Sequence, residues 1–377
     1  MPRQTPILMT PGPITAKAAV HDAMRFDHNP GDRGIADMTR RIRDYVLTLG
    51  NAAGTHECVP LQGSATYGTE AVVLACVPAD GKVLVVNNGF YGVRARDVVA
   101  ATGRAVATFD VPGFGLPDLD DLARRIDADP AITHVLVCQV ETGTGALNPA
   151  ADVAKLAQEH GKGVIVDAVA AFGALPLDIG GLGLDAVVAS PNKCLEGVPG
   201  IALPILRRDV LAKSAGRYGG MALDLHARWR QYEQTGCWTF TAPTHVVAAL
   251  DAAIGIHAAE GGAPARLRKY RQTWQWLVDG MRQAGIAILI PDEIASPIVV
   301  TFHRPADPAF AWEPFFEGVK RRGYWLFNGK LTQIPTFRIG CMGSVGEADM
   351  AGLVAAVDET LLEMGVRDRS PAGLAVA

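Results

Sequence analysis

The chain has 377 residues and a formal net charge of −4, and 49% of its residues are hydrophobic and 20% charged. This composition is typical of a folded globular protein of about two domains. The slightly acidic balance argues against a nucleic-acid partner, and no stretch approaches the ~20 consecutive apolar residues of a membrane span. The six cysteines include no C-x-x-C pair, which disfavours a metal site and indicates a reduced, cytoplasmic protein.

Short apolar runs alternate with helix-like stretches through the first two thirds of the chain. Runs that are almost continuously apolar are typical of strands buried on both faces. We expect strands at 83–86, 134–140, 163–166, 186–189 and 201–206, and helices at 64–76, 119–126 and 149–160. This alternation predicts a mostly parallel sheet with helical crossovers, which is an α/β fold.

The pattern changes near residue 245. Two long helical stretches, 245–261 and 263–285, are followed by short strand-like runs at 297–302 and 336–339 and by a last helix at 347–364. This mix predicts a smaller α+β domain. We therefore divide the chain into an N-terminal arm (1–15), a large α/β domain (16–250) and a small C-terminal domain (251–377).

Two charged side chains stand at the ends of predicted strands. Lys193 follows the run 186–189, and Asp167 ends the run 163–166. A lysine in a pocket loses its proton more readily and attacks carbonyl groups, and open α/β sheets bind ligands at the carboxyl ends of their strands. Taken alone, each is more simply a solvated lysine or a turn-capping aspartate. Their spacing of one strand–helix–strand unit predicts that the two strand ends are neighbours.

Two further features are suited to anions. Gln62-Gly63-Ser64-Ala65-Thr66 precedes a helical stretch, where hydroxyls and free N–H groups form a phosphate seat or a plain N-cap. Arg338 lies between apolar residues and needs an anionic partner, either a structural carboxylate or a substrate carboxylate or phosphonate. No Walker loop or G-x-G-x-x-G follows a strand, which disfavours a nucleotide. A phosphate seat, an aspartate, a lysine and an arginine in this order fit a pyridoxal phosphate site.

At this point the sequence resembles the class V branch of the fold-type I pyridoxal-phosphate aminotransferases. Within that class it is most similar to the enzymes that act on 2-aminoethylphosphonate and pyruvate. The resemblance is carried by nine blocks: Leu8-Met9-Thr10-Pro11-Gly12-Pro13, Leu61-Gln62-Gly63-Ser64, Asn88-Gly89-Phe90-Tyr91-Gly92, Glu141-Thr142-Gly143-Thr144-Gly145, Val166-Asp167-Ala168, Asn192-Lys193-Cys194, Gly197-Val198-Pro199-Gly200, Phe240-Thr241-Ala242-Pro243-Thr244-His245 and Phe337-Arg338-Ile339-Gly340. It implies an enzyme of phosphonate catabolism that turns 2-aminoethylphosphonate and pyruvate into phosphonoacetaldehyde and alanine, built as a homodimer with shared sites.

The resemblance also implies a role for individual residues. Lys193 would hold pyridoxal phosphate covalently and move the proton during amino transfer, Asp167 would pair with the ring nitrogen, and Tyr91 would stack on the ring. The other cofactor contacts would be Ser64, Ala65, Thr66 and Asn192 at the phosphate, Thr144 near the ring edge, and Thr241 with Trp238 at the phosphate of the neighbouring subunit. Substrate contacts would be Arg338, Thr10, Gly12 and Arg33, the last as a second cation for a phosphonate.

Some alternatives stay open. The segment 25–34 departs from the pattern of the phosphonate enzymes, and it either lines the mouth of the site or forms a surface loop. An alanine–glyoxylate or serine–glyoxylate aminotransferase, or another small ω-amine:pyruvate transaminase, would share the same blocks. A desulfurase is disfavoured because no cysteine lies on a flexible glycine-rich loop. A non-catalytic protein of the same fold is disfavoured because Lys193, Asp167 and Arg338 are all present.

Overall fold

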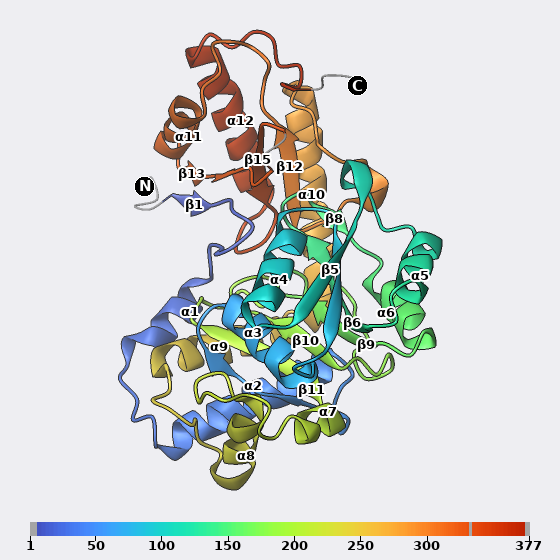
Figure 1. The fold of residues 1–377 in the computed structure, drawn as a ribbon. Helices are drawn as coiled ribbons and strands as arrows, with labels where there is room; N and C mark the ends of the chain where they lie inside the picture. The colour runs from blue at the N-terminus through green and yellow to red at the C-terminus, as the bar shows by residue number, and fades with distance from the viewer. Residues whose placement is uncertain (1–5, 332–333, 374–377) are drawn as a thin grey trace.

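The computed structural model describes residues 6–331 and 334–373, and an eight-stranded sheet forms its centre (Figure 1). The strands run in the order β2-β11-β10-β9-β6-β4-β5, with β3 beside β11. Their bounds are β2 His56–Cys58, β3 Leu61–Gln62, β4 Lys82–Asn87, β5 Ala105–Asp110, β6 Ile132–Cys138, β9 Gly163–Asp167, β10 Ala186–Ala189 and β11 Ile201–Arg207. The five strands from β10 to β5 are parallel to their neighbours, and β11 is antiparallel to β10, β2 and β3. The predicted mostly parallel sheet is therefore confirmed.

The sheet is sandwiched by helices, as parallel strands require. Helix α3 (Ala65–Cys76) packs on β10 and β11, and α4 (Phe90–Ala101) packs on β4 and β5. Helix α6 (Ala150–Glu159) packs on β6 and β9, beside α5 (Leu119–Asp127). Because the central strands are covered on both faces, their side chains are almost all apolar and buried, as in the run Val83–Val86. The short elements η2 (Pro112–Phe114), β7 (Val140–Glu141) and β8 (Ala146–Leu147) lie in the connections.

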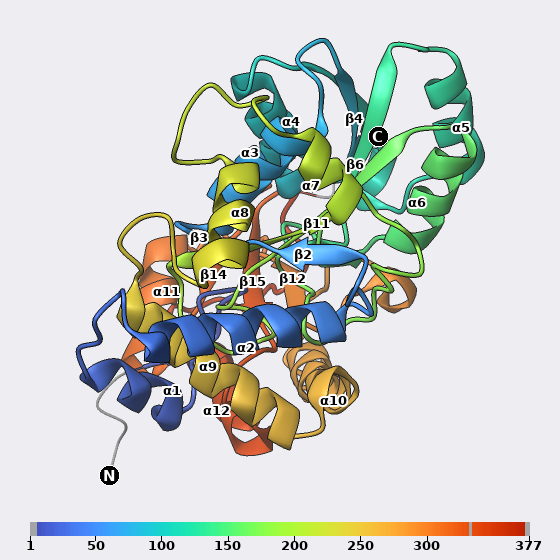
Figure 2. The ribbon, with the colours of Figure 1, turned by 90° about the horizontal axis from the view of Figure 1, so that it is seen from below.

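A second group of helices covers the side of the sheet near β2 (Figure 2). It consists of α1 (Ala18–Asp22), η1 (Ala23–Arg25), α2 (Arg33–Leu49) and α9 (Thr244–Ala259). Helices α7 (Arg208–Lys213) and α8 (Leu225–Thr235) instead pack beside α3. Helices α2 and α9 lie side by side, and α2 turns Ile35, Ile42 and Val46 toward the core. The segment 25–34 thus leads into a surface helix that begins at Arg33.

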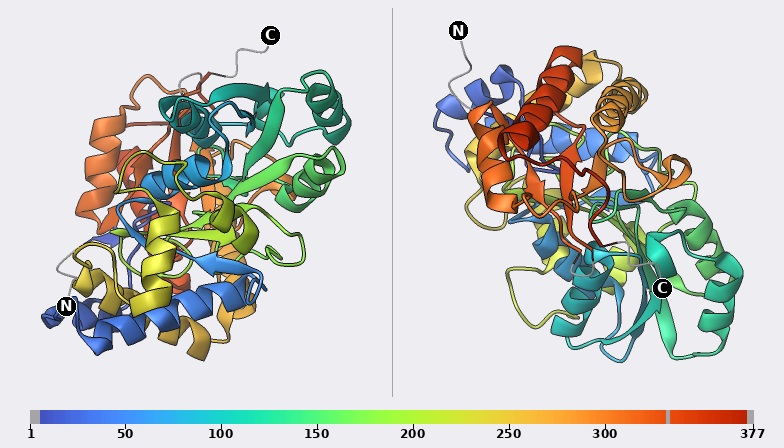
Figure 3. Two further views of the ribbon diagram at one scale, coloured as in Figure 1. Left: turned by 60° about the horizontal axis from the view of Figure 1, so that its bottom comes forward. Right: turned by 90° about the horizontal axis from the view of Figure 1, so that it is seen from above.

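The C-terminal part forms a smaller α+β body (Figures 1 and 3). Its antiparallel sheet has the order β12-β15-β14, and α10, α11 and α12 pack around it. The bounds are α10 Gly262–Gln283, η3 Asp292–Ile294, β12 Val299–His303, α11 Trp312–Arg321, β13 Tyr324–Trp325, β14 Phe327–Asn328, β15 Thr336–Gly340 and α12 Glu347–Glu363. The N-terminal arm joins this body, because β1 (Ile7–Leu8) pairs with β13.

The apolar core has separate clusters in the two bodies. Leu250 and Ile254 of α9 belong to the large cluster around the central sheet, whereas Leu277 and Met281 of α10 belong to the cluster of the small body. The predicted boundary at residue 250 lies within α9, and the division of the chain at that residue stays a prediction. A third cluster, which includes Ile14, Val299 and Met342, packs where the arm and the two bodies meet.

Within the described residues no single helix is long and apolar enough to cross a membrane. Helices α9 and α10 satisfy the criterion of length and composition only as a pair, with a bend of 83° between them. All six cysteines are free, and only Cys237 is partly exposed. No group of three or more metal-ligating side chains occurs in the described part of the chain.

Candidate active site

A cavity of about 180 Å³ opens at the carboxyl ends of β9 and β10, between the N-terminal turns of α3 and α4. Parallel sheets bind ligands at this edge, because the strand ends leave a crevice there. Seven of the predicted site residues line the cavity: Ser64, Ala65, Thr66, Tyr91, Asp167, Asn192 and Lys193. The structure thus brings together side chains that span 130 positions of sequence, from Ser64 to Lys193.

Lys193 sits in the turn that follows β10, with its amine directed at the N-terminal arm. The Nζ atom donates a hydrogen bond to the carbonyl oxygen of Pro11 at 2.6 Å. Burial, together with the positive charge of Arg338, lowers the pKa of Lys193 to about 8. The amine is therefore far more readily deprotonated than a surface lysine, as a nucleophile and proton carrier must be.

Gly12 allows the arm to approach this lysine. A Cβ atom at Gly12 would lie 2.1 Å from Lys193 Nζ, and the residue has a φ of +119°. Only glycine adopts such a backbone conformation readily and leaves room for the amine. Thr10 is buried beside it, and its hydroxyl accepts a hydrogen bond from the Gly12 N–H at 3.3 Å and donates one to the Pro13 carbonyl oxygen.

Asp167 ends β9, next to the strand that leads to Lys193, because β9 and β10 are parallel neighbours. Its Oδ1 accepts a hydrogen bond from the Val169 N–H at 2.9 Å. Burial raises the pKa of Asp167, while the Val169 N–H and the charge of Lys193 act in the opposite direction. The carboxylate forms no ion pair with a described residue, so it can hold a cationic group of a ligand.

The N-terminus of α3 forms one wall of the cavity. Ser64 is the N-cap residue, but its hydroxyl makes no capping bond, which leaves the hydroxyl available to a ligand. The N–H groups of Ala65 and Thr66 belong to the first turn, where they have no intrahelical acceptor. An anion is favoured at such a place because these donors and the helix dipole point at it.

Glu141 fixes the opposite wall. Its carboxylate accepts hydrogen bonds from the N–H groups of Tyr91 and Gly92, at 2.8 and 3.1 Å, and of Gly143 at 2.7 Å. It therefore caps the N-terminus of α4, which places the Tyr91 ring at the cavity. Burial raises the pKa of Glu141 to about 7, against the effect of the three N–H donors.

Arg338 lies on β15 and is almost fully buried, with 1% of its surface exposed. Its Nη1 donates to the Thr142 carbonyl oxygen at 3.1 Å and its Nε to the Asn328 carbonyl oxygen at 3.3 Å. Burial lowers the pKa of Arg338, and the nearby Tyr91 raises it. No carboxylate among the described residues forms an ion pair with it. A buried guanidinium held only by neutral oxygens is suited to an anionic ligand.

The remaining predicted residues do not line this cavity, and neither do Arg338, Thr10 and Gly12. Thr144 is buried, and its hydroxyl donates to the Glu141 carbonyl oxygen at 3.3 Å. Trp238 is buried, and its indole N–H donates to Thr39 at 2.9 Å. Thr241 is exposed, with its carbonyl oxygen bonded to the Gln62 amide. The Arg33 side chain is 92% exposed, and its Nε lies 3.9 Å from Asp37.

Arg94 lines the cavity although no role was predicted for it. Its guanidinium lies over the rings of Phe90 and Tyr91, at 4.9 and 5.1 Å from their centroids. Its positive charge acts to lower the pKa values of Asp167, Lys193 and Arg338. The sequence held one signal for Arg94: it lies three residues after Tyr91, and residues i and i+3 share a helix face.

Comparison with other proteins decides the family. The model of the family "Aminotransferase class-V" matches residues 17–308. The chain belongs to the class V aminotransferase family. It is 45% identical to 2-aminoethylphosphonate–pyruvate transaminase 2 of Burkholderia lata, over 96% of both chains. It is 44% identical to 2-aminoethylphosphonate–pyruvate transaminase of Pseudomonas entomophila, over 96% of this chain and 99% of that one.

Solved structures agree on the fold. The pyridoxamine–pyruvate aminotransferase of Mesorhizobium loti superposes with a TM-score of 0.87 at 23% identity, covering 98% of this chain and 95% of that one. The ureidoglycine–glyoxylate aminotransferase of Bacillus subtilis gives 0.87 at 20% identity, with 98% and 96% covered. The fold is therefore that of the fold-type I aminotransferases.

As a member of this family, the chain is a pyridoxal-phosphate-dependent aminotransferase. The cavity fits that cofactor on three counts. Lys193 offers an amine with a lowered pKa, Asp167 offers a partly buried carboxylate without a cationic partner for a ring nitrogen, and α3 offers free donors for a phosphate.

Proposed function

We propose that this aminotransferase moves the amino group of 2-aminoethylphosphonate to pyruvate, giving phosphonoacetaldehyde and alanine. The observation that carries the proposal is the buried Arg338, whose guanidinium has no carboxylate partner among the described residues. It supports a substrate with an anionic end in both half-reactions. The identity of 45% over 96% of both chains with a 2-aminoethylphosphonate–pyruvate transaminase supports a phosphonate as one of these anions.

The chemistry divides between cofactor and protein. Bound pyridoxal phosphate supplies the electron sink for breaking the C–H bond next to the amine. We propose that Lys193 anchors the cofactor and carries the proton, and that Asp167 keeps the ring nitrogen protonated. Tyr91 would lie against the ring, with Ser64, Ala65, Thr66 and Asn192 at the phosphate. Because a carboxylate and a phosphonate both accept a guanidinium fork, Arg338 can serve donor and acceptor in turn.

We further propose a cytoplasmic homodimer. The free cysteines support a reducing compartment. The large apolar side chains of Tyr67 and Phe240 are 53% and 37% exposed, next to the cofactor wall at Ser64 and to Thr241. A second copy that covers them would bring Thr241 to its partner's phosphate site. A mass in solution of twice 39.9 kDa is the expected result of light scattering.

A donor screen tests the substrate. The purified holoenzyme is supplied with pyruvate and one donor at a time: 2-aminoethylphosphonate, serine, taurine or β-alanine. A separate reaction contains alanine as the donor and glyoxylate as the acceptor. We expect kcat/KM for 2-aminoethylphosphonate to exceed that of every other donor by about 10²-fold, because a site built for a tetrahedral phosphonate dianion makes contacts that a planar carboxylate or a singly charged sulfonate does not reproduce. Alanine formation from carboxylate donors alone would refute the phosphonate and favour a glyoxylate-type enzyme.

A further inference from the structure

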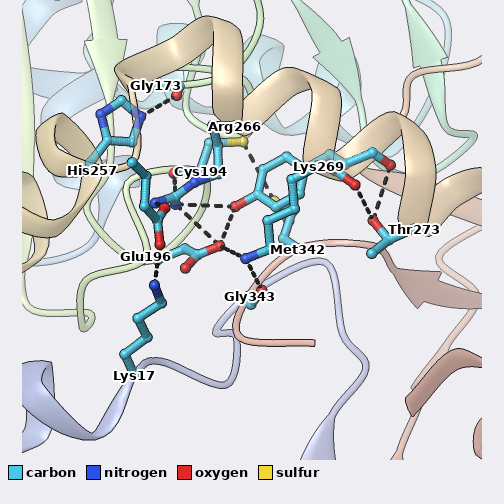
Figure 4. A network of polar contacts seen from close by, with 12 residues as sticks. Lys17, Gly173, Cys194, Glu196, His257, Arg266, Lys269, Thr273, Met342 and Gly343 are labelled. Atoms are coloured by element: carbon cyan, nitrogen blue, oxygen red, sulfur yellow. Dashed lines mark hydrogen bonds and ion pairs between the residues drawn. The ribbon is translucent and has the colours of Figure 1, made fainter. Parts of the chain in front are cut away.

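A buried cluster of charges packs against the turn that carries Lys193 (Figure 4). At its centre is Glu196, whose Oε1 accepts hydrogen bonds from the Tyr270 hydroxyl at 2.7 Å and from Lys269 Nζ at 3.1 Å, and lies 3.1 Å from Arg266 Nη1. All three partners are on α10, and Glu196 and Arg266 are almost fully buried. One helix thus concentrates its polar side chains on a single carboxylate of the lysine turn.

The cluster holds the main chain of that turn directly. Arg266 Nη1 donates to the carbonyl oxygen of Cys194, the residue after Lys193, at 2.8 Å. The N–H of Glu196 donates to the Lys193 carbonyl oxygen at 2.9 Å. Glu196 also has a φ of +55°, a conformation that favours glycine. A glutamate at this position indicates that its side chain does something glycine could not.

The cluster also reaches the other segments of the active site. Lys269 Nζ donates to the Gly343 carbonyl oxygen at 2.7 Å, in the loop that follows the strand of Arg338 (Figure 4). Arg266 Nη2 pairs at 2.7 Å with Glu260, which in turn pairs with Lys17 of the N-terminal segment. The turn that carries Lys193 is therefore connected to the small body and, through Lys17, to the segment that follows the N-terminal arm.

Stability alone explains this cluster poorly. Buried ion pairs contribute little net stability, and apolar replacements often do as well. Glu196 Oε2 and Arg266 Nε even lack a hydrogen-bond partner among the described residues. What such a cluster provides is a defined geometry between the elements that it connects.

We propose that Glu196, held by Arg266, Lys269 and Tyr270, is a positioning residue for Lys193. It fixes the main chain of the lysine turn relative to the strand that carries Arg338, so that the amine and the substrate-binding guanidinium keep a set separation. The proposal rests on the proposed function, in which Lys193 and Arg338 act on the same substrate.

Two variants on α10 test it. Tyr270→Phe removes the hydroxyl that contacts Glu196. Thr273→Val, one turn further along, removes a buried hydroxyl that donates to the Cys341 carbonyl oxygen at 2.9 Å and does not contact the lysine turn. We expect similar falls in melting temperature for both holoenzymes. We expect only Tyr270→Phe to speed hydrogen exchange at the Glu196 and Gly197 amides, and to lower kcat by about 10-fold with KM within twofold of wild type, because small misplacements of a reacting group are costly.

The outcomes are distinct. Wild-type exchange at the turn in Tyr270→Phe, or equal loss of kcat in Thr273→Val, would overturn the proposal. If Tyr270→Phe does not fold, Lys269→Met is measured in its place, with the same expected results. If the wild-type enzyme proves inactive with 2-aminoethylphosphonate, the proposed function fails, whereas hydrogen exchange and the rate at which Lys193 captures pyridoxal phosphate still test the positioning.

Discussion

Replacement of Lys193 by Ala is expected to abolish covalent binding of pyridoxal phosphate and to lower kcat by roughly 10⁴-fold, near the upper range for loss of a positioned acid–base group. The amine lies at the cavity, beside Asp167 and at 2.6 Å from the Pro11 carbonyl oxygen. The visible absorption of the holoenzyme and single-turnover rates with 2-aminoethylphosphonate measure the two effects. Lys213→Ala is the matched control, because that lysine is on the surface, with 71% of its side chain exposed.

The same experiment has a pH dependence with a defined sign. Only the neutral amine attacks the aldehyde, so capture of pyridoxal phosphate by the cofactor-free chain should be slow at low pH and accelerate as the pH rises. The midpoint should lie near 8, where burial and Arg338 place the pKa of Lys193, and not near that of a solvated lysine. Covalently bound cofactor in Lys193→Ala, or a midpoint above 10, would contradict the assignment.

The parallel sheet could be predicted because burial leaves a clear trace in the sequence. Strands β4, β9, β10 and β11 are covered on both faces, so they read as continuous apolar runs. Strand β5 was not predicted, because it forms the edge of the sheet and its residues Ala105–Asp110 are partly exposed. Helix α2 was also missed, although Ile35, Ile42 and Val46 have the spacing of a helix face.

The site could be predicted only where one local element carries it. Asp167 ends β9 and Lys193 lies in the turn after β10, and the parallel pairing of these two strands makes their ends neighbours. The helix that the spacing predicted between them is absent, because turns alone connect β9 to β10. The contact of Lys193 with Pro11 joins residues that are 182 positions apart in the sequence, so no local sequence pattern predicts it. For Trp238 the resemblance implied a contact with the partner's cofactor phosphate. In the structure its indole N–H donates to Thr39, and the cofactor contact stays a prediction.

Arg338→Ala is expected to weaken both half-reactions by about 10²–10³-fold in kcat/KM, because two hydrogen bonds to a charged group contribute about 3–4 kcal/mol. The residue is buried on β15, and its guanidinium is held by the carbonyl oxygens of Thr142 and Asn328 without a carboxylate. Stopped-flow absorbance follows each half-reaction separately, with 2-aminoethylphosphonate and then with pyruvate. Arg338→Lys should recover part of the loss, since a lysine retains the charge but not the planar fork.

The matched control is Arg304→Ala. Arg304 also bonds backbone and side-chain oxygens near β15, those of Thr336 and Asn328, but its charge, unlike that of Arg338, is not among those that lower the pKa of Lys193. It should lose stability and keep both rates. Normal rates in Arg338→Ala would remove the residue from the substrate site. A loss confined to pyruvate would show that the phosphonate is bound elsewhere, and Arg94, the exposed cation that lines the cavity beside Tyr91, would be the residue to replace next.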